Sequence, residues 1–231
     1  MREDKSKIVF LDFCDTVVDF QTADAFVNFC KKRTTYRKFP YRFKIFLHKT
    51  RLYGLVDSFF KKDQLGKMLD LLCFSGKERE LIDKLAKEFY LEMIKPRFIQ
   101  GVIEPVRKYI RDNYTVVIVS GGYDAYINYF ASEFGIKYIV CNQFYYKKDI
   151  FKGKIKEHDC MGQEKISRIK LLAEQEGLIL DSDNTVCFSD SESDIPLFKL
   201  CKKRFCVLSK EKYHNQTPKW VNDISGIVVW H

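Results

Sequence analysis

The sequence of 231 residues has no long hydrophobic run. No stretch reaches the roughly 18 consecutive apolar residues that identify a transmembrane helix. The charged segment 1–7 leads directly into a short apolar run and lacks the apolar core of a signal peptide. We therefore expect neither a membrane span nor a cleaved leader, and we expect a cytoplasmic location.

Histidine is scarce, and closely spaced cysteine pairs are absent. The eight cysteines form no Cys-x-x-Cys pair and several lie in apolar runs, so we expect free thiols rather than disulfides. The four histidines are scattered, which argues against a histidine-based zinc site. Hydrophobic residues make up 46% of the chain, a composition that is typical of a globular protein and excludes disorder.

Acidic residues are nearly absent from the segment 31–62, which holds eleven lysines and arginines and one aspartate, Asp57. The segment therefore carries a net charge of +10 in a chain whose net charge is +9, and aromatic residues are interleaved with the basic ones. Three interpretations are open. The segment is a solvated helical face with an aromatic underside on the core, a basic rim that attracts an anionic small molecule, or a surface for nucleic acid or an anionic membrane.

Short apolar runs alternate with helical patterns. The runs predict β-strands at residues 7–13, 114–120, 137–141, 185–189 and 204–208, the second of which is expected to end at Gly121 and Gly122. The helical patterns cover residues 102–112, 123–134, 163–176 and 192–200. This order predicts an α/β fold with a Rossmann-like parallel sheet and helices on both faces.

Two segments interrupt this alternation. Residues 20–98 have helical periodicity without a convincing strand, and we interpret them as an inserted helical cap. Residues 142–157 look like a β-hairpin with a polar turn, which we interpret as a small flap. The predicted core domain then consists of residues 1–19 and 99–231, with the flap inside it.

Polar groups gather at or near the predicted strand ends. They are the side chains of Asp12, Ser120, Asp190 and, four residues on, Asp194, the backbone amide of Gly121, and Lys165, which opens the helix before the fourth strand. In an open parallel sheet, ligands bind at the carboxyl ends of the strands, so these groups are expected to meet there. The carboxylates of Asp12 and Asp190 suit Mg²⁺, a carboxylate can attack phosphorus, and hydroxyl, amide and ammonium groups can hold phosphoryl oxygens. Each residue alone has an ordinary explanation as a turn, cap or surface residue, but their joint order indicates phosphoryl transfer.

Four motifs resemble those of the haloacid dehalogenase-like hydrolase superfamily, and most of all the branch that contains phosphoserine phosphatase. Residues 8–16 resemble the first motif, Asp-x-Asp-x-Thr after an apolar strand, and residues 117–123 resemble the second. Lys165 resembles the lysine of the third motif, and residues 186–197 resemble the fourth. The resemblance covers residues 7–208 and implies a helical cap at 20–98 and a flap at 142–157.

The resemblance implies a Mg²⁺-dependent phosphoric monoester hydrolase. Asp12 would be the nucleophile and a Mg²⁺ ligand, and the backbone carbonyl of Cys14 and the carboxylate of Asp190 would complete the protein ligands. Asp194 would support the metal site. Ser120, Gly121 and Lys165 would hold the phosphoryl group of a small phosphate ester. No nucleic-acid partner is expected, and the oligomeric state is open.

Two departures from the family pattern stand out. Cys14 occupies the place of the second aspartate of the first motif, which in the family protonates the leaving group and later activates water. A thiol is a poor base at neutral pH, so we expect either a preference for good leaving groups or slow turnover. Gln21 stands where phosphoserine phosphatases have an acid for the substrate amine, which favours a more anionic or sugar-like phosphate. The alternative is a catalytically weak relative that serves as an anionic-ligand or membrane-surface binding module.

Overall fold

A parallel sheet forms the centre of the computed structural model, which describes residues 4–50, 52–58, 65–180, 183–215 and 224–230. Its strand order is β3-β2-β1-β6-β7-β8, and every neighbouring pair is parallel. The strands are β1 (Ile8–Leu11), β2 (Thr115–Tyr123), β3 (Tyr138–Asn142), β6 (Thr185–Ser189), β7 (Lys203–Ser209) and β8 (Gly226–Trp230). Strand β1 is buried along its whole length because both faces of the sheet are covered, which explains its unbroken apolar sequence.

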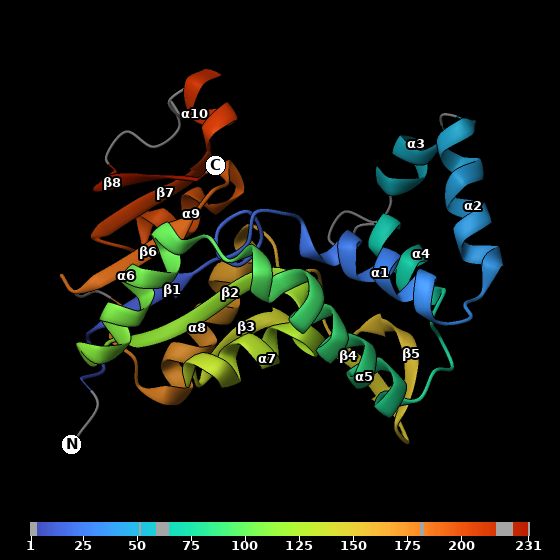
Figure 1. Cartoon of the computed structure of the whole chain (residues 1–231), viewed down its shortest axis with the longest axis horizontal. Helices are drawn as coiled ribbons and strands as arrows, with labels where there is room; N and C mark the ends of the chain where they lie inside the picture. Colours follow the sequence, from blue (N-terminus) through green and yellow to red (C-terminus); the bar gives the residue numbers. More distant parts are fainter. Residues whose placement is uncertain (1–3, 51, 59–64, 181–182, 216–223, 231) are drawn as a thin grey trace.

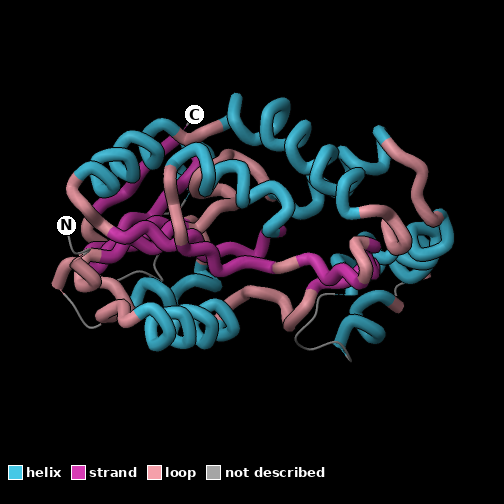
Figure 2. The backbone as a smooth tube through the Cα atoms, turned by 90° about the horizontal axis from the view of Figure 1, so that it is seen from below, coloured by secondary structure: helices cyan, strands magenta, loops and turns pink. Residues whose placement is uncertain are grey.

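Helices cover both faces of this sheet (Figure 2). Successive strand residues point to opposite faces, so Val9 and Leu11 pack with α6 (Gln100–Arg111) and α7 (Asp124–Phe134). Ile8 and Phe10 pack with α8 (Gln163–Glu176) and α9 (Ile195–Lys199) on the other face. A short helix, α10 (Lys210–Asn215), follows β7. The predicted α/β fold with a Rossmann-like sheet is confirmed.

The sheet differs from the sequence prediction in three places. Strand β8 was not predicted; it adds to β7 at the edge of the sheet. Strand β2 does not end before Gly121 but continues to Tyr123, with an irregular register beyond Val119. The predicted helix at 192–200 begins as a 3₁₀ turn, η4 (Glu192–Asp194), because Pro196 lies in the first turn of α9 and has no backbone N–H to donate.

The segment between β1 and β2 is helical, as predicted. It contains α1 (Thr22–Arg33), α2 (Lys38–Lys49), α3 (Tyr53–Asp57), α4 (Leu65–Leu72) and α5 (Arg79–Phe89), followed by the π-helical turn η2 (Tyr90–Ile94) and the 3₁₀ turn η3 (Lys95–Arg97). Phe26 joins this segment to the core, since its ring lies 5.3 Å from the rings of both Phe89 and Tyr126. Part of the basic segment, namely Arg51, Phe59, Phe60, Lys61 and Lys62, lies outside the described residues.

None of the helices in the described ranges has the length and apolarity needed to cross a bilayer. Figure 1 shows α2 and α3 at one end of the molecule and the sheet strands β7 and β8 at the other. All eight cysteines are free thiols, and seven of them are buried.

The predicted hairpin consists of β4 (Phe144–Lys147) and β5 (Ile150–Ile155), which pair antiparallel. Its two turn residues, Lys148 and Asp149, have φ angles of +52° and +55°, as a two-residue type I′ turn requires. Gly153 has a φ of +69° and lies against α4, so that a Cβ atom there would be 2.8 Å from Cβ of Ser75 and 3.0 Å from Cα of Leu72. The hairpin therefore packs closely against the end of α4.

We expect Gly153→Ala to lower the free energy of unfolding by about 2 to 4 kcal/mol, from left-handed backbone strain and steric overlap together. Urea denaturation followed by circular dichroism measures this value. Gly135→Ala is the matched control, because Gly135 has a similar φ of +65° but no described atom within 4 Å of an added Cβ. The control should cost only about 1 kcal/mol. Equal losses in the two variants would contradict the close packing of β5 on α4.

Candidate active site

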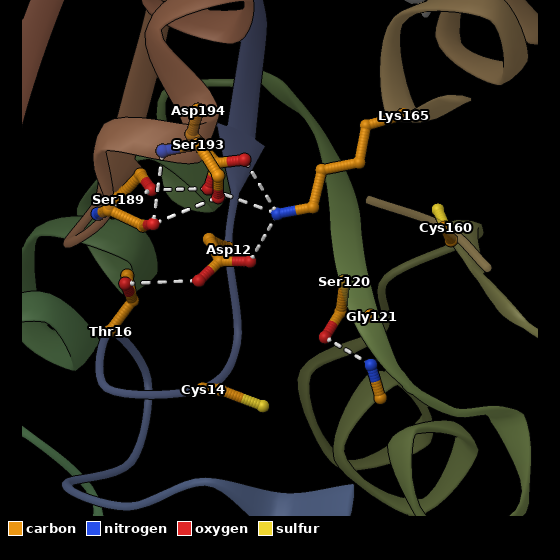
Figure 3. A network of polar contacts seen from close by, with 12 residues as sticks. Asp12, Cys14, Thr16, Ser120, Gly121, Cys160, Lys165, Ser189, Ser193 and Asp194 are labelled. Atoms are coloured by element: carbon orange, nitrogen blue, oxygen red, sulfur yellow. Dashed lines mark hydrogen bonds and ion pairs between the residues drawn. The ribbon is translucent and has the colours of Figure 1, made fainter. Parts of the chain in front are cut away.

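The site lies where β1 and β6 end, at the carboxyl edge of the sheet (Figure 3). Asp12 directly follows β1, and its backbone N–H donates to the carbonyl of Phe188 in β6 at 3.0 Å. Asp190 directly follows β6. The hydroxyl of Thr16 lies 3.3 Å from Oδ2 of Asp12 and 3.5 Å from Oδ1 of Asp190. The parallel pairing of β1 with β6 therefore brings these two carboxylates together around one hydroxyl group.

Lys165 enters the site from the first turn of α8 and bridges two acids. Its Nζ donates to Oδ1 of Asp12 at 2.9 Å and to Oδ1 and Oδ2 of Asp194 at 2.9 and 3.0 Å. Ser189 donates to Oδ2 of Asp194 at 2.6 Å, so both oxygens of that carboxylate have partners. All four groups are buried. The pairing offsets the cost of removing these charges from water.

Burial also shifts the proton affinities of the site. It raises the pKa of Asp12 to about 7, with Lys165 opposing that rise and Asp194 and Asp190 adding to it. It raises the pKa of Asp190 to about 6, with Lys212 opposing and Asp15 and Asp194 adding. Although burial favours the neutral amine, attraction by Asp12 and Asp194 raises the pKa of Lys165 above its usual range. Burial thus opposes ionisation of the Asp12 and Asp190 carboxyl groups.

Ser120, Gly121 and Gly122 form the neighbouring wall at the end of β2. The hydroxyl of Ser120 accepts a hydrogen bond from the Gly122 backbone N–H at 3.0 Å. Side chains at these glycines would displace their neighbours: a Cβ at Gly121 would lie 2.5 Å from Met161 Sδ, and one at Gly122 would lie 2.7 Å from the hydroxyl of Tyr126. The glycines therefore let the backbone approach its neighbours closely at the edge of the site.

The turn after β1 separates Cys14 from Asp15. The Cys14 thiol lies 3.0 Å from the hydroxyl of Thr22, and burial raises its pKa to about 11. Asp15 has a left-handed backbone with a φ of +52°, which aspartate tolerates better than most residues. Its carboxylate accepts a hydrogen bond from Gln21 Nε2 at 2.7 Å. Asp15 therefore does not replace the carboxylate that the sequence lacks at position 14.

A cavity of about 190 Å³ connects these groups. Every predicted site residue contributes to its wall, namely Asp12, Cys14, Gln21, Ser120, Gly121, Lys165, Asp190 and Asp194. The rest of the cavity wall is formed mainly by Asp24, Lys67, Met161, Ser191 and Ser193. Such a volume accommodates a small ligand. The structure thus brings together all the residues that the sequence prediction singled out.

Sequence reasoning missed a second polar group beside the cavity. Lys67 of α4 donates to Oδ1 and Oδ2 of Asp159 at 3.0 and 2.9 Å and to the carbonyl of Gly121 at 3.3 Å. Asn142 donates to the same Gly121 carbonyl at 2.9 Å and to Asp159 at 2.6 Å. Lys67 also lines a second cavity of about 510 Å³. No motif marks these residues, because only the packing of α4 on the core brings them together.

The basic segment 31–62 contributes no described residue to the wall of the 190 Å³ cavity. Lys67, which lies outside that segment, and Lys165 are the cations that line it. Asp24, in the first turn of α1, also places a carboxylate there. The interpretation of residues 31–62 as a rim around an anionic ligand therefore gains no support from the described part of this cavity.

The pKa of Asp12 gives a pH dependence of stability. The folded-state pKa of Asp12 is about 7, whereas its ordinary value is 3.8. The contribution of Asp12 to the free energy of unfolding is therefore fully present below pH 3.8 and is lost as the pH rises through 7. In EDTA, the melting temperature of the wild type relative to Asp12→Asn should therefore fall by several degrees from pH 5 to pH 8. A difference that grows with pH over this range would contradict the assignment. Differential scanning calorimetry in matched buffers measures it.

The comparison with known proteins agrees with this geometry. The phosphoserine phosphatase of Methanocaldococcus jannaschii is 26% identical over 215 residues, which cover 91% of each chain. Two solved structures share the fold at lower identity. A protein with unknown function from Bordetella pertussis Tohama I has a TM-score of 0.69 and 16% identity over 92% of both chains. A phospho-aspartyl intermediate analogue of phosphoserine phosphatase has a TM-score of 0.61 and 19% identity over 97% of this chain and 94% of that one.

The family model described as haloacid dehalogenase-like hydrolase matches residues 9–199, from β1 to the end of α9. This range contains the strand-end carboxylates, the Ser120 loop and the buried lysine. The resemblance seen in the four sequence motifs is therefore confirmed. This chain belongs to the haloacid dehalogenase-like hydrolase family.

Proposed function

We propose that this chain is a Mg²⁺-dependent phosphatase that hydrolyses a small anionic phosphomonoester through an aspartyl-phosphate on Asp12. One observation carries the proposal. The Asp12 carboxylate lies in a cavity of about 190 Å³ that also contains Lys165, Ser120, Gly121 and Asp190. A nucleophile, donors for phosphoryl oxygens and acids for a cation thus share one small space.

Asp12 is proposed as the nucleophile. Lys165 contacts Oδ1 of Asp12 at 2.9 Å. Among the described residues, Oδ2 of Asp12 has the longer contact of 3.3 Å with Thr16. We therefore propose that Oδ2 attacks phosphorus. Lys165 stays protonated and offsets negative charge on the transferring group. The Ser120 hydroxyl accepts its hydrogen bond from Gly122, so its own proton is available to a phosphoryl oxygen. The Gly121 backbone N–H is proposed as a further donor.

The residues fit Mg²⁺. The carboxylates of Asp12, Asp190 and Asp194 outnumber the ammonium of Lys165, and carboxylates are the hard oxygen ligands that Mg²⁺ prefers. Within the described ranges no three histidine, cysteine or acidic side chains converge as a metal-binding group. Mg²⁺ retains several waters, however, and needs only one or two carboxylates. We propose Asp12, Asp190 and the Cys14 backbone carbonyl as ligands, and Asp194 as the residue that positions Lys165. When bound, the ion would offset charge on the phosphoryl oxygens.

Cys14 is proposed to set the leaving-group preference. With its pKa raised to about 11, the thiol stays protonated at neutral pH and cannot act as a base. Asp15 is held by Gln21 and does not line the cavity. An ester whose leaving oxygen needs no proton should therefore react faster than an alkyl phosphate. Asp24 and Lys67 offer charges of both signs to the rest of the substrate.

The domain division remains part of this proposal: a core of residues 1–19 and 99–231, a cap of residues 20–98 and a flap of residues 142–157. It is supported by the origin of the cavity wall. Gln21, Asp24 and Lys67 come from the helical segment, whereas Asp12 and Lys165 come from the sheet edge and α8. The Lys67–Asp159 ion pair joins the two parts beside the cavity.

Asp12→Asn should abolish Mg²⁺-dependent hydrolysis of p-nitrophenyl phosphate, by more than about 10⁴-fold, because removal of a nucleophile eliminates the covalent route. Release of p-nitrophenolate with Mg²⁺ and with EDTA measures the loss. Asp112→Asn, which makes the same change on an exposed residue, should keep the wild-type rate. If the wild type does not hydrolyse p-nitrophenyl phosphate, the result would support the alternative of a catalytically weak binding module.

Cys14→Asp should raise kcat for alkyl phosphates by about a hundredfold or more, the scale of general acid–base catalysis, while changing p-nitrophenyl phosphate turnover little. Cys14→Asn is the control, since it has a similar size but no ionisable group. Malachite-green detection of phosphate over a panel of esters, phosphoserine among them, gives both rates. Unchanged kcat for every alkyl ester would show that the missing carboxylate does not limit turnover.

A further inference from the structure

Two groups of basic residues can be told apart between α1 and α4. In the first group, Lys31 and Lys44 both pair with the buried Asp70 of α4, at 3.0 and 2.5 Å. Arg33 pairs with Glu92 at 2.5 Å. Each of these cations already has a carboxylate partner, as the interpretation of a packed and solvated helical face requires.

The second group consists of Lys38, Arg42 and Lys49 of α2. All three are exposed, and no carboxylate among the described residues pairs with them. Their spacing of four and seven residues places them in one row along the helix. The row is therefore a line of positive charge that the described fold does not neutralise.

A row of phenylalanines lies beside this line of charge. Phe39, Phe43 and Phe46 follow one another at spacings of four and three residues, which also place them in one row, and they are 78%, 38% and 54% exposed. The rings of Phe39 and Phe43 stack on each other, with centroids 6.3 Å apart and planes at 10°. Leu52, which directly precedes α3, and Leu55 of α3 are also exposed, at 43% and 63%. Exposed apolar side chains gathered in a row on one helix mark interaction surfaces.

The side of α2 that packs on the rest of the protein is not the side that carries the phenylalanine row. Leu47 is buried against Leu65 and Leu69 of α4, with Tyr53 and Val56 of α3 beside them. The interpretation with an aromatic underside does not hold for these three phenylalanines, which face outward, whereas the buried residue of α2 is the aliphatic Leu47. Leu47 and the Lys44–Asp70 pair hold the helix in place while the phenylalanine row stays uncovered.

We name the exposed side chains of this region the α2–α3 surface. It comprises Lys38, Phe39, Arg42, Phe43, Phe46, Lys49, Leu52 and Leu55. Figure 1 shows α2 and α3 at the end of the molecule away from β7 and β8, where no other labelled element covers them from outside. The surface does not line the cavity around Asp12.

We propose that the α2–α3 surface docks on an anionic lipid bilayer. A row of cations next to a row of phenylalanines is the arrangement of interfacial helices, in which aromatic and aliphatic side chains enter the headgroup boundary and basic side chains contact lipid phosphates. Charge complementarity selects an anionic surface, since the exposed row is wholly basic. The exposed leucines select a surface with an apolar interior.

Two other occupants fit less well. A second copy of the chain would bring like cation rows together on a symmetric interface, which opposes association. Nucleic acid would satisfy the cations and could stack on the phenylalanine rings, but Leu52 and Leu55 offer bases no stacking partner. A bilayer uses the cationic, aromatic and aliphatic side chains together. The proposal stands independently of the phosphatase chemistry, since it rests on residues outside the cavity.

Co-sedimentation of the full chain with vesicles tests the proposal. The wild type should sediment with mixed phosphatidylcholine and phosphatidylglycerol vesicles, and not with phosphatidylcholine vesicles alone. The association should weaken with added salt, because the electrostatic part is screened. Phe46→Trp should show a blue-shifted emission with anionic vesicles that brominated acyl chains quench, since the side chain enters the bilayer.

Two sets of variants separate the two rows. Vesicle binding should weaken by at least about tenfold in each of two variants. The first is the triple variant Lys38→Gln/Arg42→Gln/Lys49→Gln, and the second is the double variant Phe39→Ser/Phe46→Ser. Lys147→Gln/Lys148→Gln/Lys170→Gln removes the same charge from other exposed sites, and Leu91→Ser/Leu171→Ser removes two other exposed apolar side chains. Both control sets should bind as the wild type does. An unchanged melting temperature of the phenylalanine variant, measured by circular dichroism, shows that the variant is folded.

Several results would overturn the proposal. They are no sedimentation of the wild type with anionic vesicles, an equal loss in the matched lysine control, and retention of binding in the phenylalanine variant. Tighter binding of the wild type to polyuridine than to vesicles would identify nucleic acid instead. A dimer in light scattering that Phe39→Ser/Phe46→Ser dissociates would identify a second copy. None of these outcomes depends on whether Asp12 is the nucleophile.

Discussion

The bridge from Lys165 to Asp12 and Asp194 is the interaction on which the site depends. Three charges are buried at the carboxyl edge of the sheet, and such burial is unfavourable unless the charges pair with good geometry. Lys165 meets both acids at 2.9 Å, although Asp12 lies 153 residues away in sequence and Asp194 lies 29 away. The pairing of β1 with β6 and the packing of α8 on the sheet must both form before these contacts exist.

The helical segment and the sheet are one packed body at the site. Aromatic residues make the junction, with Phe26 of α1 in contact with Phe89, Tyr126 and Phe144 from three other elements. Thr22 continues this junction in polar form, since its hydroxyl lies between the Cys14 thiol and the hydroxyl of Tyr126. Cys14 is therefore linked through Thr22 to both α1 and α7, and a substitution at residue 14 would alter its contact with α1.

Positive charge serves different purposes in different places. Lys165 is buried and compensates carboxylates, Lys67 joins α4 to Asp159 beside the cavity, and Lys44 holds α2 to α4 through Asp70. The row of Lys38, Arg42 and Lys49 does none of these things. A high net charge in one segment is thus the sum of structural ion pairs and an exposed remainder, and only the remainder is free to interact with a partner.

The sequence by itself determined the parallel α/β sheet, the helical segment between its first two strands, the hairpin, and the position of Asp12, Ser120 and Asp190 at or near strand ends. It could do so because buried strands, amphipathic helices and turn residues are local patterns, and strand ends meet at one edge of a parallel sheet. The edge strand β8 was not predicted, although Ile227, Val228, Val229 and Trp230 form an unbroken apolar run; its pairing with β7 is seen only in the structure.

Only the tertiary structure decided which acids pair with Lys165, where Asp15 points and what Lys67 contacts. The partners of Lys165 depend on the pairing of β1 with β6 and on the packing of α8. The direction of Asp15 depends on its left-handed backbone, and the contacts of Lys67 depend on the packing of α4 against the core. No local sequence pattern specifies these three features. The same holds for α2. Its sequence shows aromatic and basic residues at helical spacing, but the contacts of Leu47 with α4 decide which of its faces is covered and which stays exposed.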